Sequence, residues 1–384
     1  MSERLAHYVS DRPFNPAEPV AMSPELERYY LASQWQMMWR RFKRHKIAVV
    51  SAIVLLLSYA SILVTEFLAP YNLHTRNTEF IYAPPQRPRL FHEGSFIGPY
   101  VYPLKYSLNM QTLKREYEPD HSQPQKLRFF CSGDDYNFWG LILGSFHVLC
   151  PPEKGTAFFL GTDRLGRDML SRLLYGARIS LTVGLVGIAI SFVLGIVIGG
   201  IAGFFGGRTD AFIQRVIEIL RSLPELPLWL ALSAALPANW SPILVYFGIT
   251  IILGLLDWPG LARAVRSKLL SLRQDDFVVA SRMMGGRPPH IIGRHLVPNF
   301  MSHLIASATL SIPGMILGET ALSFLGLGLR PPITSWGVLL AEAQNVEAIA
   351  LYPWLLLPMV PVIVVTLAFN FLGDGMRDAA DPYH

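Results

Sequence analysis

Long apolar runs are the feature that most constrains how this chain can fold. The run IAVVSAIVLLLSYASILV, residues 47–64, contains no charged residue, and several more apolar runs follow in the second half of the chain. A helix needs about 20 apolar residues to cross the hydrocarbon core of a bilayer. Only 16% of all residues are charged, whereas a soluble domain has about 25%. The chain is therefore predicted to be a helical integral membrane protein.

Basic residues are concentrated beside two of these runs. The segment RRFKRHK, residues 40–46, precedes the first run, and RAVRSKLLSLR, residues 263–273, follows a later one. Lys and Arg beside membrane segments favour the cytoplasmic side, so both segments are expected inside the cell. Because these basic residues lie next to membrane segments, they are expected to contact membrane lipid and not nucleic acid.

The apolar runs predict an all-α polytopic membrane protein with six transmembrane helices and both termini in the cytoplasm. The third span is the least regular, because Pro224 and Pro227 should kink it. The fourth is expected to end before Asp257, and its helix is expected to extend into the cytoplasm with a stripe of leucine and valine that ends at Leu272. The expected spans are 47–65, 179–204, a short run ending near Leu236, 243–256, 300–322 and 350–373.

Four regions follow from these spans. A cytoplasmic segment, residues 1–46, precedes the first transmembrane helix, residues 47–65. An extracytoplasmic lobe, residues 66–177, is inserted between the first and second helices. The remaining five helices form a core, residues 178–384, with a cytoplasmic loop at about 258–298. Because the lobe is rich in aromatic residues, a small folded unit with short strands is expected there.

The chain contains two cysteines, Cys131 and Cys150, and both fall in the lobe. An oxidising extracytoplasmic compartment permits a disulfide between them. Two free buried thiols are the alternative. Neither cysteine has metal-ligand spacing to the nearby histidines, so no metal site is expected.

Four glycines recur at intervals of four residues within and just after the second predicted span. On a helix this spacing places them on one face, where small residues let another backbone approach closely. General enrichment of glycine in membrane helices is the alternative explanation. Tight helix packing is predicted at Gly195, Gly199, Gly203 and Gly207.

The sequence contains no recognisable catalytic motif. It lacks a G-x-x-x-x-G-K-[ST] phosphate loop, H-E-x-x-H and G-x-S-x-G. Acidic residues are almost absent from the spans, and Glu319 is the main exception. It is interpreted as a gate or packing residue, with a proton relay as the alternative. No catalytic residue, cofactor or metal ligand is expected on this chain.

The polar stretch DDFVVASRMMGGRPPHIIGRHLVPN, residues 275–299, predicts two short helices that meet at a tight corner. Asp275 and Asp276 can begin the first helix. Gly285 and the glycine after it can end that helix, and Pro288 suits the first position of the next.

The first of these helices is expected to present a mostly apolar face formed by Phe277, Ser281 and Met284. Such a bent connection is longer than two neighbouring helices require. Its shape suits the groove of a partner protein, while a basic loop that only fixes the topology is the alternative.

The segment ASRMMGGRPPHIIGRHLVPN resembles the coupling motif of ATP-binding-cassette (ABC) importer permeases. That motif is written E-A-A, three residues, G, nine residues, I-x-L-P. Ala280, Gly285 and Pro298 match its first alanine, its glycine and its proline. The departures from the motif are Val279, Ser281, His295 and Val297.

Three further segments resemble the dipeptide and oligopeptide branch of these permeases. They are FLGTDRLGRDMLSRLLYGARISL (159–181), GETALSFLGLGLRPPITSWG (318–337) and GDGMRDAADP (373–382). The likeness covers residues 159–384 and much of 40–69, but it does not cover residues 70–158.

The resemblance implies the permease subunit of an ATP-driven importer in a bacterial inner membrane, with peptides as the first candidate substrate. Oligosaccharides or other peptide-sized solutes are the alternative substrates. A membrane-anchored receptor or an intramembrane enzyme is the alternative from a different class.

The resemblance also implies partners. They are two ATPase subunits or domains that carry ATP and Mg, a second homologous permease and an extracytoplasmic substrate-binding protein. The ATPases would be engaged by residues 276–298. The residues expected to couple to them are Asp276, Ala280, Ser281, Gly285, Ile291, Arg294, His295 and Pro298.

Overall fold

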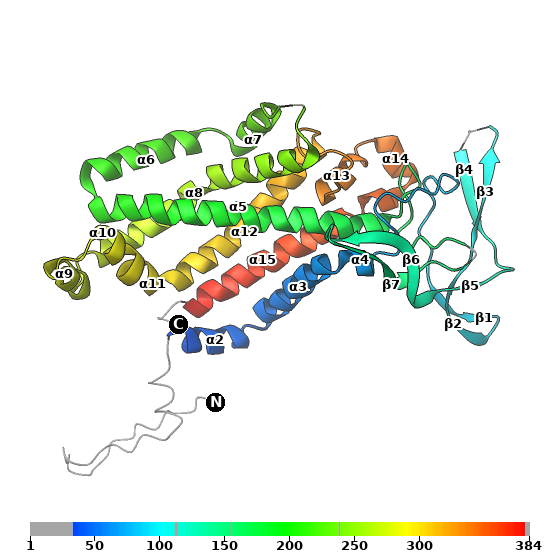
Figure 1. Ribbon diagram of the computed structural model, residues 1–384, viewed down its shortest axis with the longest axis horizontal. Helices are drawn as coiled ribbons and strands as arrows, with labels where there is room; N and C mark the ends of the chain where they lie inside the picture. The colour runs from blue at the N-terminus through cyan, green and yellow to red at the C-terminus, as the bar shows by residue number, and fades with distance from the viewer. Residues whose placement is uncertain (1–33, 112–113, 154, 238, 381–384) are drawn as a thin grey trace, which may run out of the picture.

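A bundle of long helices with a strand-rich lobe at one end makes up the computed structural model (Figure 1). It describes residues 34–111, 114–153, 155–237 and 239–380. Most of the N-terminal segment predicted at 1–46, and the last four residues, lie outside this range. The end of the bundle beside the strands is called the lobe end, and the opposite end, which carries residues 276–299, is called the loop end.

Five helical segments of the described chain are long and apolar enough to cross a membrane. They are α3 (Lys46–Leu63), α5 (Met169–Phe205), α8 (Pro242–Leu272), α12 (Met301–Phe324) and a final segment Pro353–Ala380, which comprises η2 (Pro353–Leu356) and α15 (Met359–Ala380). The shorter helices are α2 (Gln34–Arg44), α4 (Thr65–Leu68), α6 (Gly207–Ser222), α7 (Glu225–Ala234), α13 (Trp336–Ala341) and α14 (Val346–Leu351).

The predicted third span is not among these five helices. Its apolar residues form α7, which has only 10 residues. Leu223 and Pro224 are extended, so α6 ends before them and α7 begins after them. Pro224 lacks a backbone N–H and therefore favours such a break.

Two helices extend beyond the predicted spans. The helix that contains the second span begins at Met169, inside the region assigned to the lobe, because the Asp168 carboxylate caps it by accepting a hydrogen bond from the Ser171 N–H. The helix of the fourth span continues past Asp257 and Pro259 to Leu272, as the sequence predicts. Asp257 accepts a hydrogen bond from Ser191 on α5 at 3.2 Å, so its polar side chain is satisfied within the bundle.

The predicted glycine face lies between α5 and α8. A Cβ atom at Gly195 would lie 2.8 Å from the Cβ of Leu261, and one at Gly199 would collide with the carbonyl oxygen of Ala262. Gly203 is similarly close to Leu269 and Arg266. The fourth glycine, Gly207, does not share this contact.

Gly207 falls outside the face because α5 ends at Phe205. The chain turns there through two glycines with positive φ, 65° at Gly206 and 55° at Gly207. Nothing lies within 4 Å of a Cβ atom built at Gly207. Its spacing matches the other three glycines, but the helix that would align them has already ended.

The lobe consists of antiparallel strands in three small sheets, ordered β1-β2-β5, β3-β4 and β6-β7. The disulfide Cys131–Cys150 joins β6 to β7. The strands are β1 (Arg89–His92), β2 (Ser95–Val101), β3 (Leu104–Asn109), β4 (Lys114–Pro119), β5 (Gln125–Lys126), β6 (Arg128–Phe138) and β7 (Ile142–Cys150).

Candidate functional site

The connection between α8 and α12 forms two short limbs that meet at a corner, as the sequence predicts (Figure 1). The first limb is α9 (Asp276–Met283), with Asp275 in an extended conformation at its N-cap. The second limb comprises α10 (Pro288–His290), the π-helical η1 (Ile291–Leu296) and α11 (Val297–Asn299).

Two glycines make the corner. Gly285 has a φ of 84°, a conformation that side chains with a Cβ atom adopt only with strain. The N–H of Gly286 donates to the carbonyl of Ser281 at 2.9 Å, and a Cβ atom there would lie 2.7 Å from that same oxygen. The corner therefore requires glycine at both positions.

The π-helical turn of the second limb was not predicted. In an α-helix the N–H of residue 298 would donate to the carbonyl of Arg294, but Pro298 has no N–H. The Val297 N–H instead donates to the carbonyl of Ile292, five residues back. Such wider turns occur mostly as short interruptions of α-helices, often at functional sites.

Buried apolar residues fix both limbs to the bundle. Val278 of α9 and Ile291 and Leu296 of the second limb are fully buried, at 0% exposure. Together with Val297 of the second limb, they pack in one cluster with the loop ends of α5, α8 and α12, through Phe204, Leu261, Val265, Leu269, Phe300 and Leu304. A force applied to the corner would therefore be transmitted directly to three of the long helices.

The exposed side of α9 is mostly apolar, although Asp276 and Arg282 are exposed as well. Phe277 and Val279 are 40% and 41% exposed, and Met283 and Met284 are 85% and 83% exposed. Of the residues predicted to form an apolar face, Phe277 and Met284 are exposed, whereas Ser281 is buried. Met284 is the C-cap residue that follows α9.

The eight predicted coupling residues divide between the two sides of the loop. Ser281 and Ile291 face the bundle, and His295 is half-buried. Its ring lies 5.4 Å from that of His290, and its carbonyl accepts a hydrogen bond from the Asn299 side chain at 3.0 Å. The exposed residues are Asp276, Ala280, Gly285, Arg294 and Pro298.

Glu319 is fully buried in α12 within a group of serines. It accepts hydrogen bonds from Ser180 of α5 at 3.0 Å and from Ser323 of its own helix at 2.8 Å. Ser180 also accepts the N–H of Trp336 at the start of α13. Glu319 thus lies where three helices are joined by hydrogen bonds, as a packing role requires.

A buried ion-pair network at the lobe end was missed in the sequence. The Asp163 carboxylate lies 2.6 Å from the guanidinium of Arg167 and 2.5 Å from that of Arg172. Glu342 contacts the same two arginines at 3.1 and 2.9 Å. The cations around the start of α5 could be seen in the sequence, but nothing in it pairs them with an acid so far along the chain.

A second ion pair holds the start of the lobe against the bundle. Arg178 of α5 contacts Glu66 of α4 at 2.6 Å, and its guanidinium lies 4.2 Å from the ring centre of Trp139. Burial raises the pKa of Glu66, but the hydrogen bonds and charge of Arg178 outweigh it and leave that pKa below its ordinary value. Glu66 is therefore ionised at neutral pH.

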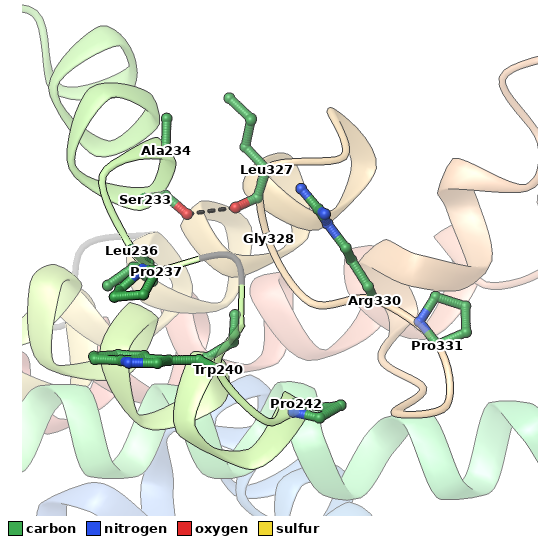
Figure 2. A pocket seen from close by; sticks show the side chains of 11 residues that line it. Ser233, Ala234, Leu236, Pro237, Trp240, Pro242, Leu327, Gly328, Arg330 and Pro331 are labelled. Atoms are coloured by element: carbon green, nitrogen blue, oxygen red, sulfur yellow. Dashed lines mark hydrogen bonds between the residues drawn. The ribbon is translucent and has the colours of Figure 1, made fainter.

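Hollows occur on the lobe half of the bundle. One of about 310 Å³ lies between the end of α7, the start of α8 and the turn after α12, where Ser233 donates to the carbonyl of Leu327 at 2.5 Å (Figure 2). Trp240 and the Arg330 side chain line opposite sides of it. A larger, mostly apolar hollow of about 1080 Å³ lies between α7, α12 and the segment Trp336–Met359.

Comparisons with known proteins agree with the resemblance seen in the motifs. Residues 195–383 match the family described as binding-protein-dependent transport system inner membrane component. Residues 33–85 match the N-terminal TM domain of oligopeptide transport permease C.

The chain covers most of the length of the named relatives. The oligopeptide transport system permease protein OppC of Haemophilus influenzae is 42% identical over 233 residues, which are 60% of this chain and 72% of that protein. The dipeptide transport system permease protein DppC of Lactococcus lactis is 32% identical over 351 residues, 91% of each chain. An inward-facing structure of the MetNI methionine ABC transporter has a TM-score of 0.45 at 19% identity, covering 56% of this chain and 98% of that one.

Proposed function

Because the chain belongs to the family of inner-membrane components of binding-protein-dependent transport systems, we propose that it is the permease subunit of an ATP-driven peptide importer. It is a multi-pass membrane protein of a transport family and carries several apolar helices. Peptides are the proposed substrate because its relatives are named as oligopeptide and dipeptide permeases.

The observation that supports coupling to an ATPase is the exposed apolar side of α9. Met283 and Met284 are held in the open by a limb whose other side is anchored in the bundle. Methionine adapts its shape to a partner surface, and an apolar helix face suits a protein groove. Residues 276–298 are proposed to occupy such a groove on an ATPase subunit.

The proposed topology has six membrane crossings. The third is made by α6 and α7 together, which follow each other from the loop end towards the lobe end (Figure 1). With this broken crossing, the loop end and both termini lie in the cytoplasm and the lobe lies outside. The basic residues of α2 beside the first span favour the same orientation.

The large hollow beside α7 and α12 is proposed to form half of the translocation path. A second, homologous permease would supply the other half. ATP and Mg are proposed to bind two separate ATPase subunits or domains, and an extracytoplasmic binding protein would deliver the substrate. No cofactor is proposed for this chain itself.

Uptake by the complete transporter tests the substrate. The chain, its second permease, the ATPases and the binding protein are reconstituted in liposomes with ATP inside, and entry of labelled peptides and oligosaccharides is measured. ATP-dependent entry of peptides alone is expected. Entry of oligosaccharides without entry of peptides would show that oligosaccharides, and not peptides, are the substrate.

A glycine substitution tests the coupling loop. Gly285→Val forces a β-branched residue into the left-handed conformation, which costs about 1–2 kcal/mol locally and distorts the corner. Peptide-stimulated ATP hydrolysis should be lost although the protein still inserts in the membrane. Gly260→Val, outside residues 276–298, is the matched control, because nothing lies within 4 Å of a Cβ atom there. Unchanged transport by Gly285→Val would remove the coupling assignment.

A further inference from the structure

The turn between β6 and β7 exposes three consecutive aliphatic side chains. Leu141, Ile142 and Leu143 are 85%, 64% and 79% exposed. A contiguous apolar run of this kind is unfavourable in water and marks a surface that another apolar phase covers. The run carries no charge, and the nearby cation Arg178 is already paired with Glu66.

The position of this turn is fixed by Trp139. The indole N–H of Trp139 donates at 3.1 Å to the carbonyl of Leu63, the last residue of the first membrane helix α3. Its backbone N–H points to Glu66 at 3.4 Å, and Arg178 stacks on its ring. In Figure 1, β6 and β7 lie beside α4 and the adjoining end of α5. The turn is therefore held at the level where α3 leaves the membrane.

Aromatic side chains form a row beside this turn. Phe146 of β7 lies 5.5 Å from Phe67 of α4 and 6.4 Å from Phe130 of β6, measured between ring centres. Phe130 and Phe146 are 65% and 47% exposed. Aromatic residues at the ends of membrane segments typically lie in the interfacial layer. A row of them next to an aliphatic tip is the order expected for a segment that enters a bilayer from its surface.

The exposed apolar surface continues from the hairpin onto α3. Leu56, Leu57 and Leu63 are 69%, 64% and 57% exposed along that helix, and they would face lipid in the membrane. The hydrogen bond from Trp139 to Leu63 joins the two surfaces directly.

We propose that the β6–β7 hairpin inserts Leu141–Leu143 into the leaflet on the lobe side of the membrane. The partner is the acyl-chain region of the lipid, with Trp139, Phe130 and Phe146 in the interfacial layer. The disulfide Cys131–Cys150 ties the hairpin to itself near its base, and the Arg178–Glu66 pair ties its tip to the bundle. The hairpin thereby fixes the lobe against the membrane surface.

Photocrosslinking in intact membranes tests this proposal. A benzoylphenylalanine residue is introduced at Leu141 of the full chain, expressed with its partner subunits. As a control, the same residue is introduced at Phe96, which is 66% exposed on the distant β1–β2 hairpin. After irradiation, mass spectrometry identifies what is attached at each position.

A lipid adduct at position 141, and none at position 96, is the expected result. A protein adduct at position 141 would identify the tip as a docking surface for another protein and overturn the proposal. Equal or absent lipid labelling at both positions would also overturn it. None of these outcomes depends on which solute is transported, so the proposed function is tested separately.

A double variant provides a second test. With the photoreactive residue at position 142, Leu141→Asp together with Leu143→Asp should reduce the lipid adduct, because charged residues are costly in the bilayer. The melting temperature in detergent reports whether the lobe remains folded. A folded variant with undiminished lipid labelling would contradict insertion of the tip.

Discussion

At the lobe end of the bundle, charged side chains are buried and paired with one another, whereas at the loop end apolar side chains are left exposed. Asp163 and Arg172 are 0% and 1% exposed, and Glu342 completes their network. Met283 and Met284 at the loop end are more than four-fifths exposed. The charges of this network satisfy one another, whereas the two methionines form an exposed apolar surface that a partner is proposed to cover.

This difference suggests that the two ends serve different purposes, the lobe end stability and the loop end binding of a partner. Residues at the lobe end should determine how much free energy is needed to unfold the protein, because breaking a buried ion pair leaves an uncompensated charge. Exposed residues of the loop end should matter mainly for binding to the ATPases. Substitutions at the two ends therefore test this difference through their effects on the free energy of unfolding.

Asp163→Ala should have the largest effect. It removes the carboxylate that lies between Arg167 and Arg172 and leaves two buried cations with Glu342 alone. Breaking a buried pair in this way costs about 3–5 kcal/mol. Unfolding by heat and denaturant in detergent measures the loss. Asp135→Ala, at an exposed acid of the same lobe, should leave the unfolding midpoint unchanged.

The stability of the folded protein should depend on pH through Asp168 at the lobe end. Burial raises the pKa of Asp168 at the lobe end from 3.8 to about 6. The folded state then binds this proton more tightly than the unfolded state. The contribution of Asp168 to the free energy of unfolding is fully present below pH 3.8. It falls by at most about 3 kcal/mol as the pH rises towards 6. Asp168→Asn, which keeps a capping oxygen, should abolish this loss in unfolding measured from pH 4 to 7.

Asp210 of α6 forms an ion pair with Arg266 of α8 near the loop end. Both side chains are partly exposed, so this pair should contribute less to stability than the buried pairs of Asp163. Asp210→Asn should therefore lower the free energy of unfolding in detergent by less than Asp163→Ala does. An equal or larger loss would contradict the difference between the two ends.

The contrast between the two ends also explains what could be predicted from the sequence. The corner of the loop is encoded by adjacent residues, since Asp275, Gly285 and Pro288 each specify the local backbone. The network at the lobe end joins Arg172 to Glu342, which lies 170 residues further along the chain. No local pattern identifies such a partner, so only the cations were visible.

The errors in the membrane helices have a similar origin. Pro224 was expected to kink the third span, but it separates α6 from α7, which leaves α7 with only 10 residues. Hydropathy placed the end of the fourth span before Asp257, because the hydrogen bond from Ser191 that satisfies this carboxylate comes from another helix. Gly207 kept the spacing of the glycine face, although the helix ends two residues before it.

Gly199→Val should have an intermediate effect. The added atoms would collide with the carbonyl and Cα of Ala262 and force α5 away from α8, beneath the cluster that supports the loop end. Overpacking of this kind costs about 1–3 kcal/mol. Gly260→Val on α8 is the matched control, because nothing lies within 4 Å of a Cβ atom there. Equal unfolding midpoints for the two variants would show that the glycine face is not a close contact.

Replacing Met283 and Met284 together by Ser should have the smallest effect on unfolding. Both side chains are exposed, so the free energy of unfolding should stay within about 0.5 kcal/mol of the wild type. A methionine that becomes buried against a partner contributes about 1.5–3 kcal/mol, which corresponds to roughly tenfold or more in affinity. Association with the ATPases, measured by titration in nanodiscs, should weaken accordingly, and ATP-dependent uptake should fall with it.

Met110→Ser is the control for this pair of methionines. Met110 lies in the lobe and is 79% exposed, so the same substitution removes an equally exposed side chain from the opposite end of the molecule. It should change neither unfolding nor association with the ATPases. If both variants weakened that association equally, exposure of methionine would not distinguish the two ends. If neither did, the apolar side of α9 would not be the surface by which the ATPases bind, although the corner at Gly285 could still hold the loop in shape.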